Sequence, residues 1–374
     1  MIVYCLGMEA SGSTWLYNVV RELFSLAQLK YEAFRVEEFE QIADDRAHRA
    51  KHVIMRAHNV NSYLLRFLEA ADVKTIVSFR DPRDAVASCI QRFGEFGGKL
   101  IPTCNDITRN IASAASARLS TRNQSFFYED KFTFDPKTIL QCADFLGIKI
   151  SQDDAANIFQ KYEPQKVKKI IESLEQSGDE RLFIDEVTKN VMDRETSFHK
   201  THISDMKIDK WRDVLDVESQ QKVARLFGGY VEAINDRRIG LDSATNRPLT
   251  VNFRSELFAP VDDMLHFTRH LTSPEVRTQL GIKVLDNVYL PRGRWRFDFG
   301  TDGVAGATVL KACQNGQKIY EAERENDRHE FEYLNVLHDH AFDFHLAFKE
   351  MEDDLQAGKP PRTAAVSATL VENA

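Results

Sequence analysis

Two kinds of hydrophobic pattern alternate along the first 150 residues of the chain. Short apolar runs rich in β-branched residues are typical of buried parallel strands, and they occur at 2–6, 52–55, 73–79 and 125–128. Between these runs, apolar residues recur at steps of three and four, as at 13–24, which predicts amphipathic helices. Strands that alternate with helices predict an α/β fold in which helices flank a parallel sheet.

Residues 151–240 continue the helical part of this pattern. Polar residues dominate 151–200, where the charge-rich stretch 161–175 predicts a helix with a solvated face. Another amphipathic helix is predicted at 211–229.

The pattern changes near residues 241–250, where a turn-rich segment begins. Beyond it we expect short strands and one long helix with an apolar stripe. These elements are expected at 288–300, 317–323 and 331–355. We therefore place one domain at 1–240 and a smaller C-terminal α+β extension at 241–374.

Composition and charge narrow the classes of function. The net charge of −8 argues against a non-specific nucleic-acid binder. The five cysteines show no C-x-x-C pairing, which favours reduced thiols over disulfides or a metal site. No apolar run approaches the roughly 20 residues that span a bilayer. Because the first residues lead directly into a glycine loop, we also expect no signal peptide and a cytoplasmic location.

The most informative motif is CLGMEASGSTWL at residues 5–16. Gly7, Gly12 and Thr14 occupy the positions of a phosphate-binding loop, but Ser13 stands where the lysine of an NTPase would be. The backbone N–H groups of the loop and of the following helix still form an anion site, to which the Ser13 and Thr14 hydroxyls add donors. An NTPase also needs an acidic Mg²⁺ ligand at a strand end. Asp81 is available, but it follows Arg80 directly, an arrangement that suits an anion better than a metal.

Four stretches, taken together and in this order, resemble the PAPS-dependent sulfotransferases, which use 3′-phosphoadenosine 5′-phosphosulfate (PAPS) as sulfuryl donor. The first two resemble the 5′-phosphosulfate loop and the element that carries the catalytic base. The third resembles the 3′-phosphate element, and the fourth runs from the adenine-side tyrosine to a helix that ends in Phe-Leu-Gly. They are Ser11–Trp15, Arg56-Ala57-His58, residues 79–88 and residues 128–148, with a weaker fifth match at residues 211–215. The resemblance covers about residues 1–240 and implies a P-loop kinase-like sulfotransferase fold.

This resemblance implies how the co-substrate is held. Ser11, Gly12, Ser13 and Thr14 would form the 5′ loop, without a metal. Arg80, at a strand end, and Ser88, about two helical turns later, would converge on the 3′-phosphate. The adenine would stack on Trp15 and Tyr128. The alternatives are an ion pair of Arg80 with Asp84 or Glu129, a surface role for Ser88, and core packing of the two aromatic rings.

The resemblance also implies the catalytic groups. His58 would be the general base that takes the proton of an acceptor hydroxyl or amine, since its ordinary pKa lies near neutrality. Arg56 would be its cationic partner. Both lie at a strand's carboxyl end, where ligands of such sheets bind. The alternatives are a structural histidine and a surface arginine. The expected acceptor is a small molecule or a carbohydrate.

One position departs from the family pattern. Ala10 stands where these enzymes usually carry a lysine or arginine against the leaving phosphate. We expect Arg56, Lys200, Lys207 or Lys210 to supply that charge. The departure keeps open a PAPS- or PAP-binding protein with weak or no transfer (PAP is 3′-phosphoadenosine 5′-phosphate). A P-loop nucleotide or small-molecule kinase is the alternative enzyme. For residues 241–374 we expect a role in shaping the acceptor site or in forming a homo-oligomer.

Overall fold

The computed structural model describes most of the chain, and contact density divides it into two compact units. The described residues are 1–43, 50–97, 100–184, 191–199, 207–239, 250–256, 282–302, 308–324, 328–348 and 363–372. The first unit comprises Met1–Gln220 and Ile234–Leu241, and the second comprises Gln221–Ala233 and Asp242–Ala374. The expected boundary at 240/241 lies outside the described residues, which stop at 239 and resume at 250.

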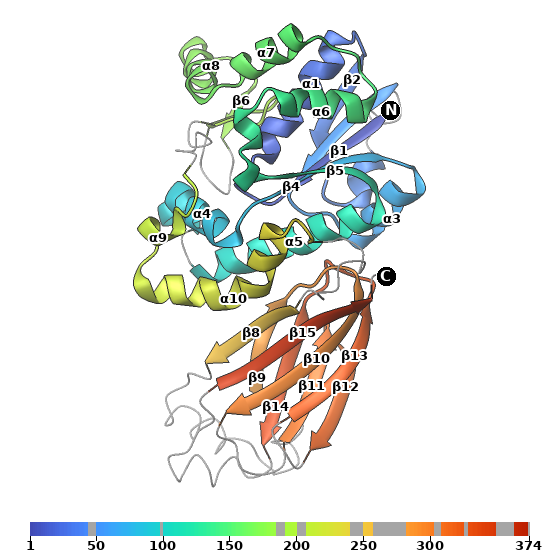
Figure 1. Cartoon of the computed structure of the whole chain (residues 1–374), viewed down its shortest axis with the longest axis vertical. Helices are drawn as coiled ribbons and strands as arrows, with labels where there is room; N and C mark the ends of the chain where they lie inside the picture. The colour runs from blue at the N-terminus through green and yellow to red at the C-terminus, as the bar shows by residue number, and fades with distance from the viewer. Residues whose placement is uncertain are drawn as a thin grey trace. The chain divides into compact units, whose positions relative to one another are not determined.

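The first unit is built on a five-stranded parallel sheet with the order β2-β3-β1-β4-β5 (Figure 1). Its strands are β1 (Ile2–Gly7), β2 (Tyr31–Arg35), β3 (His52–Ala57), β4 (Lys74–Phe79) and β5 (Arg122–Phe127). The expected α/β class is confirmed. β2 was not expected from the sequence, because this half-exposed edge strand, YEAFR, carries charges at both ends of a short apolar stretch.

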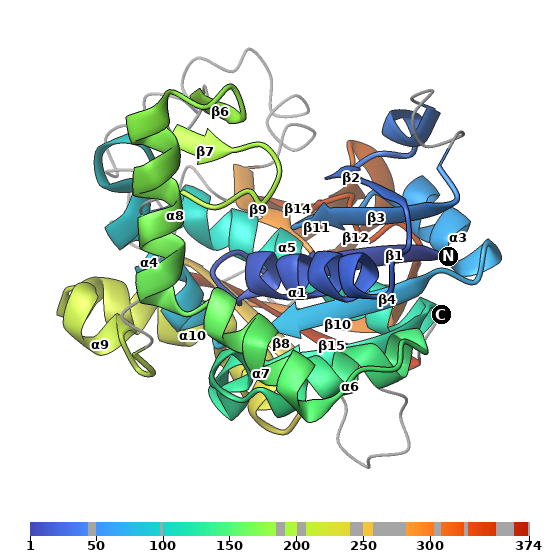
Figure 2. The ribbon, with the colours of Figure 1, turned by 90° about the horizontal axis from the view of Figure 1, so that it is seen from above.

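Helices cover both faces of this sheet, and Figure 2 shows α1 lying across one of them. The helices are α1 (Ser13–Leu26), α3 (Ser62–Ala70), α4 (Pro82–Gly97), α5 (Leu100–Ser120), α6 (Lys137–Leu146), α7 (Gln152–Lys161), α8 (Pro164–Ser177) and the short α9 (Trp211–Val214). Successive side chains of a strand point to opposite faces. Val3 and Cys5 of β1 therefore join the core beneath α1, whereas Tyr4 and Leu6 join the core beneath α3.

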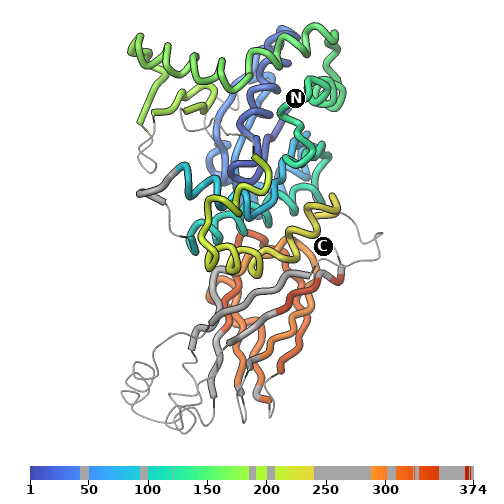
Figure 3. Tube along the Cα trace, turned by 60° about the vertical axis from the view of Figure 1, so that its left-hand side comes forward, coloured from blue at the N-terminus to red at the C-terminus, as the bar shows by residue number. Residues whose placement is uncertain are grey.

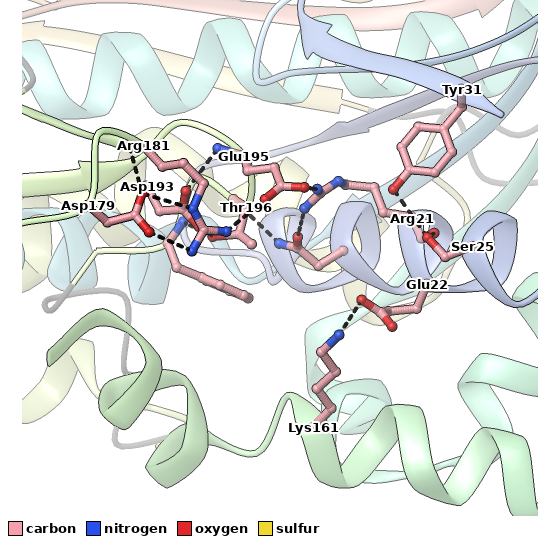
Figure 4. Close-up of polar contacts among 12 residues, drawn as sticks. Arg21, Glu22, Ser25, Tyr31, Lys161, Asp179, Arg181, Asp193, Glu195 and Thr196 are labelled. Carbon is pink, nitrogen blue, oxygen red and sulfur yellow. Dashed lines mark hydrogen bonds and ion pairs between the residues drawn. The ribbon is translucent and has the colours of Figure 1, made fainter. Parts of the chain in front are cut away.

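The sequence pattern predicted that the helical region continues beyond α8, but the segment after α8 is not helical. It forms a small antiparallel hairpin of β6 (Leu182–Ile184) and β7 (Val191–Asp193). Polar contacts then tie the following turn to α1 (Figure 4). Arg21 Nη2 donates to Glu195 Oε1 at 2.6 Å, and Asn18 Nδ2 donates to the Thr196 carbonyl at 2.8 Å. Arg181, which directly precedes β6, pairs with the other oxygen of Glu195, so this one carboxylate joins the hairpin to α1.

The second unit contains two four-stranded antiparallel sheets; Figure 1 labels their strands, and Figure 3 shows those drawn in colour from another side. Their orders are β13-β10-β15-β8 and β12-β11-β14-β9. The strands are β8 (Thr250–Glu256), β9 (Ile282–Val288), β10 (Gly293–Asp302), β11 (Thr308–Gln314), β12 (Gln317–Arg324), β13 (Arg328–Asn335), β14 (Phe342–Phe348) and β15 (Thr363–Glu372). Buried rings of Phe297 and Phe342, with centroids 5.3 Å apart, join the two sheets. The helix α10 (Val217–Asn235) contributes Tyr230, whose hydroxyl donates to the Tyr289 carbonyl.

The prediction of a long helix at 331–355 is wrong. Its described part, 331–348, contains the end of β13 and all of β14. Burial along β13 follows a period of two, since Phe331 and Tyr333 are less exposed than their neighbours Glu330 and Glu332. Aromatic residues are so frequent in this segment that they fit both the period of a strand and the period of a helix. The strand pattern was therefore interpreted as a helix.

No helix among the described residues has the length and hydropathy needed to cross a membrane.

Candidate functional site

The loop between β1 and α1 is held in an unusual backbone shape. Ala10 and Gly12 have φ values of 59° and 85°, in the left-handed region. A Cβ on Gly12 would lie 2.9 Å from the Phe132 ring, so the position needs glycine for both space and conformation. The Ala10 carbonyl accepts from Arg80 Nη1 at 3.0 Å. Arg80, which follows the neighbouring strand β4 and which the sequence predicted as a site residue, thus holds the loop in place.

Within the described part of the chain, the start of α1 has backbone N–H groups that no capping side chain satisfies. Gly12 caps the helix without a side-chain hydrogen bond, and the first turn contains no acidic residue. The first N–H groups of a helix have no partner within it and carry partial positive charge. Ser13 and Thr14 stand at this end with side chains that are nearly buried. Ser11 does not add a free hydroxyl, because its Oγ donates to the Met8 carbonyl at 2.6 Å.

Gly7 ends β1 in a close-packed position, and we expect its replacement by alanine to destabilise the loop. A Cβ there would lie 2.0 Å from Ser78 Oγ and 2.8 Å from Ser13 Cβ. Overpacking of this kind costs about 1–3 kcal/mol of unfolding free energy, measurable by urea titration. Gly228→Ala is the matched control, since a Cβ at that helical position meets nothing within 4 Å. Equal stability of the two variants would contradict the tight packing at Gly7.

His58 lies directly beyond β3, against the end of β1. Its Nδ1 lies 2.7 Å from the Gly7 carbonyl oxygen. A carbonyl only accepts, so Nδ1 carries the proton and Nε2 keeps its lone pair. The His58 pKa is lowered to about 3, mainly by burial and also by the charges of Arg56, Arg35 and Arg92, while the hydrogen bond to the Gly7 carbonyl opposes the shift. The ring is therefore neutral at pH 7, in the tautomer that a base requires.

The lowered pKa of His58 gives a direct expectation. Across pH 5–8 the ring should stay neutral, so its NMR signals should not titrate near the ordinary value of 6.5. The unfolded chain does bind that proton, so the free energy of unfolding should fall as the pH drops below about 6.5. A His58 titration with a midpoint between 6 and 7 in the folded protein would contradict this environment.

Arg56 lies two residues before His58, on the face of the sheet that α1 covers. Its guanidinium stands over the Tyr17 ring, 5.5 Å from the centroid. The Arg56 pKa is lowered to about 10, mainly by burial and also by the charge of Arg35, its register partner on β2, while Tyr17 opposes the shift. Within the described ranges the Arg56 side chain makes no hydrogen bond or ion pair. A half-buried cation beside a like charge suits an anionic ligand.

Arg80 and Ser88 come together as the sequence predicted. Arg80 follows β4, Ser88 lies in the second turn of α4, and Nη1 of the first is 3.1 Å from Oγ of the second. The alternative ion pair with Asp84 is also present, at 3.6 Å. Glu129, the other alternative partner, instead accepts from the Asp81 N–H at 2.7 Å. Arg80 therefore serves both the loop and α4.

A late segment covers Arg80, whose side chain is only 1% exposed. Its Nη2 donates to the Lys207 carbonyl at 3.2 Å, and its guanidinium stacks on Tyr128, 4.2 Å from the ring centroid. Asp84 anchors the same segment by accepting the N–H groups of Asp209 and Trp211, each at 3.0 Å. The weak fifth match at 211–215 is thus packed beside residues 79–88.

The two aromatic residues expected to stack on adenine are largely buried. Trp15 and Tyr128 are 9% and 6% exposed, and both contact the Phe132 ring. Trp15 belongs to the core beneath α1. Their role in stacking on a base stays a prediction.

Sequence reasoning missed four polar residues that surround the loop. The Glu9 N–H donates to Asn110 Oδ1 at 2.9 Å, and Cys89 Sγ lies 3.5 Å from Glu9 Oε2. Burial raises the pKa of Glu9, while the Cys89 hydrogen bond and the charge of Arg92 oppose the rise. Cys89 and Arg92 lie on α4 and Asn110 lies on α5, so only the folded helices bring them to the loop.

The cations expected to replace the missing charge at Ala10 lie in different settings. Lys207 forms an ion pair with Asp213, and both side chains are more than half exposed. Lys210 is nearly buried. Lys200 lies outside the described residues, between 199 and 207. Arg56 faces Tyr17, as described above.

The chain is similar to known proteins in fold and to a protein family in sequence. Among solved structures, a mouse sulfotransferase complexed with PAP shares 12% identity over 63% of this chain and 88% of its own, with a TM-score of 0.46. Retinol dehydratase in a complex with retinol and PAP shares 17% identity over 60% of this chain and 79% of its own, with a TM-score of 0.41. No curated protein matches the sequence. The family model described as the sulfotransferase domain matches residues 3–236. Since that match spans more than half of the chain, the protein belongs to the sulfotransferase domain family.

Proposed function

We propose that this protein transfers a sulfuryl group from PAPS to an acceptor hydroxyl or amine, with His58 as general base. The observation that carries the proposal is the neutral His58 ring, held by the Gly7 carbonyl beside an uncapped helix N-terminus in a sulfotransferase domain. Its Nε2 has a lone pair available for the acceptor's proton.

The residues present fit a nucleotide with a 3′-phosphate. The first turn of α1 offers backbone N–H groups for a 5′-phosphate. Arg80 and Ser88 converge at the end of β4, and Arg80 Nε is buried without a hydrogen-bond partner in the described structure. A 3′-phosphate there would take the place that the Lys207 carbonyl holds on Arg80 Nη2.

Each residue then has a defined task. PAPS supplies an activated sulfuryl group whose bond to the 5′-phosphate breaks as the bond to the acceptor oxygen or nitrogen forms. His58 takes the acceptor's proton at Nε2, and the Gly7 carbonyl holds the ring in place. A polyanion held at the loop would raise the His58 pKa toward neutrality, because nearby negative charge favours the protonated ring. Arg56 adds positive charge beside the base.

A second function, binding of PAPS or PAP with weak or no transfer, is favoured by one observation. The loop carries a carboxylate, Glu9, and no basic residue between Met8 and Thr14. That charge pattern supports the leaving phosphate less well than a lysine would.

Incubation with PAPS radiolabelled in its sulfate, together with a panel of small-molecule and carbohydrate acceptors, separates the two functions. We expect label in at least one acceptor and an equivalent amount of PAP. Tight PAP binding with no label in any acceptor would reject transfer in favour of the binding protein. We also propose a cytoplasmic location and a role of the second unit in acceptor shaping or oligomerisation.

A further inference from the structure

The loop that would hold the 5′-phosphate lacks a cation of its own. Residues 8–14 include the carboxylate of Glu9 and no lysine or arginine. Transferring groups and leaving phosphates are commonly stabilised by arginine, lysine or a metal. Arg80 is engaged with the Ala10 and Lys207 carbonyls, and Arg56 faces Tyr17. A further positive charge would have to come from another element.

Helix α4 packs one face against this loop. Ser88 contacts Arg80 at 3.1 Å, and Cys89 Sγ lies 3.5 Å from the Glu9 carboxylate. Arg92 follows these residues by four and three positions. Residues at that spacing lie on the same face of a helix, so Arg92 extends the face that meets the loop by one turn. Its side chain is partly buried.

The charge of Arg92 acts on groups at both ends of the site. It lowers the pKa of His58 on one side and of Glu9 within the loop. Burial is the main cause that lowers the pKa of Arg92; the charge of Arg80 adds to this effect, while Glu9 and Tyr128 oppose it. These effects agree with the place of Arg92 on the face of α4 that carries Ser88 and Cys89.

We propose that Arg92 supplies the positive charge that the loop lacks, toward the 5′-phosphate and the sulfuryl group of the co-substrate. This inference rests on the proposed function. The competing role for Arg92 is local, namely neutralising Glu9 within the folded protein. The two roles differ in what can replace the arginine.

Charge relocation tests the proposal. Arg92→Met keeps the aliphatic stem and removes the charge. We expect it to weaken PAP binding in calorimetry about tenfold or more, as for other lost hydrogen bonds to charged groups. Adding Ala10→Lys, which places a cation within the loop, should restore most of the affinity. Arg66→Ala, which removes an exposed arginine of α3, should leave the affinity unchanged.

Three readouts make the outcome decisive. Arg92→Met should raise the His58 pKa in NMR without any ligand, which checks the proximity alone. Rescue by Glu9→Gln but not by Ala10→Lys would overturn the proposal and leave the neutralising role. Unchanged PAP affinity in Arg92→Met would also overturn it, whereas a wild-type protein that binds no PAP would refute the proposed function itself. Arg92→Gln serves as a second neutral variant if the methionine variant does not fold.

Discussion

His58→Ala is expected to lower the rate of sulfuryl transfer by about 10²–10⁴-fold, the usual contribution of a positioned general base. The reason is the removal of the Nε2 lone pair that the contact with the Gly7 carbonyl makes available. PAP affinity should change little, because no phosphate contact is assigned to this ring. Initial rates with saturating PAPS and calorimetry with PAP measure the two quantities separately.

His52→Ala is the matched control for this variant. His52 begins the same strand that His58 follows, and its Nδ1 lies 3.0 Å from the N-terminal amine, at the opposite end of β3. We expect normal transfer from it. A His58→Ala protein that kept full transfer would remove the base assignment while leaving the nucleotide site intact.

Arg80→Ala is expected to cost about 1.5–3 kcal/mol of PAP binding free energy, the range for hydrogen bonds to charged groups. Its guanidinium meets Ser88 at the end of β4, where the 3′-phosphate is proposed to lie. The loss should be much smaller for AMP, which lacks only that phosphate. Calorimetric titrations of both nucleotides into both proteins give the comparison.

The comparison with AMP also separates two roles of Arg80. The same side chain holds the Ala10 carbonyl at 3.0 Å, so its removal disturbs the 5′ loop as well. Ser88→Ala leaves that contact in place and should lower PAP affinity selectively, by about 1 kcal/mol. If Arg80→Ala lost the same binding free energy for PAP and for AMP, the role of Arg80 would be to anchor the loop and not to bind the 3′-phosphate.

Much of the first unit could be predicted from the chain because its strands are apolar on both faces. β1, β3 and β4 each contain three or more consecutive buried residues, in agreement with the short apolar runs of the sequence. Their carboxyl ends carry Gly7, His58 and Arg80, and parallel pairing brings these ends to one edge. The proximity of Arg80 and Ser88 was implied by the family resemblance and is consistent with their helical spacing.

The features that could not be predicted depend on how the elements pack against one another. The pattern around Phe331 and Phe342 fitted a helix, and only pairing between strands makes it a sheet. Glu9 is distant in sequence from α4, and the packing of this helix on the loop brings Cys89 Sγ to 3.5 Å from the Glu9 carboxylate and lets the charge of Arg92 act on it. Local periodicity carries no information on that packing, so the set of charged residues predicted around His58 was incomplete.

Calorimetric titration of the wild-type protein with PAP, AMP and Mg²⁺-ATP tests the central claim most directly. PAP and AMP differ only in the 3′-phosphate that Arg80 and Ser88 are proposed to bind. We predict that PAP binds at least about tenfold more tightly than AMP, without added metal, as one or more charge-assisted hydrogen bonds imply. Equal affinity for PAP and AMP, or a preference for Mg²⁺-ATP, would contradict the account.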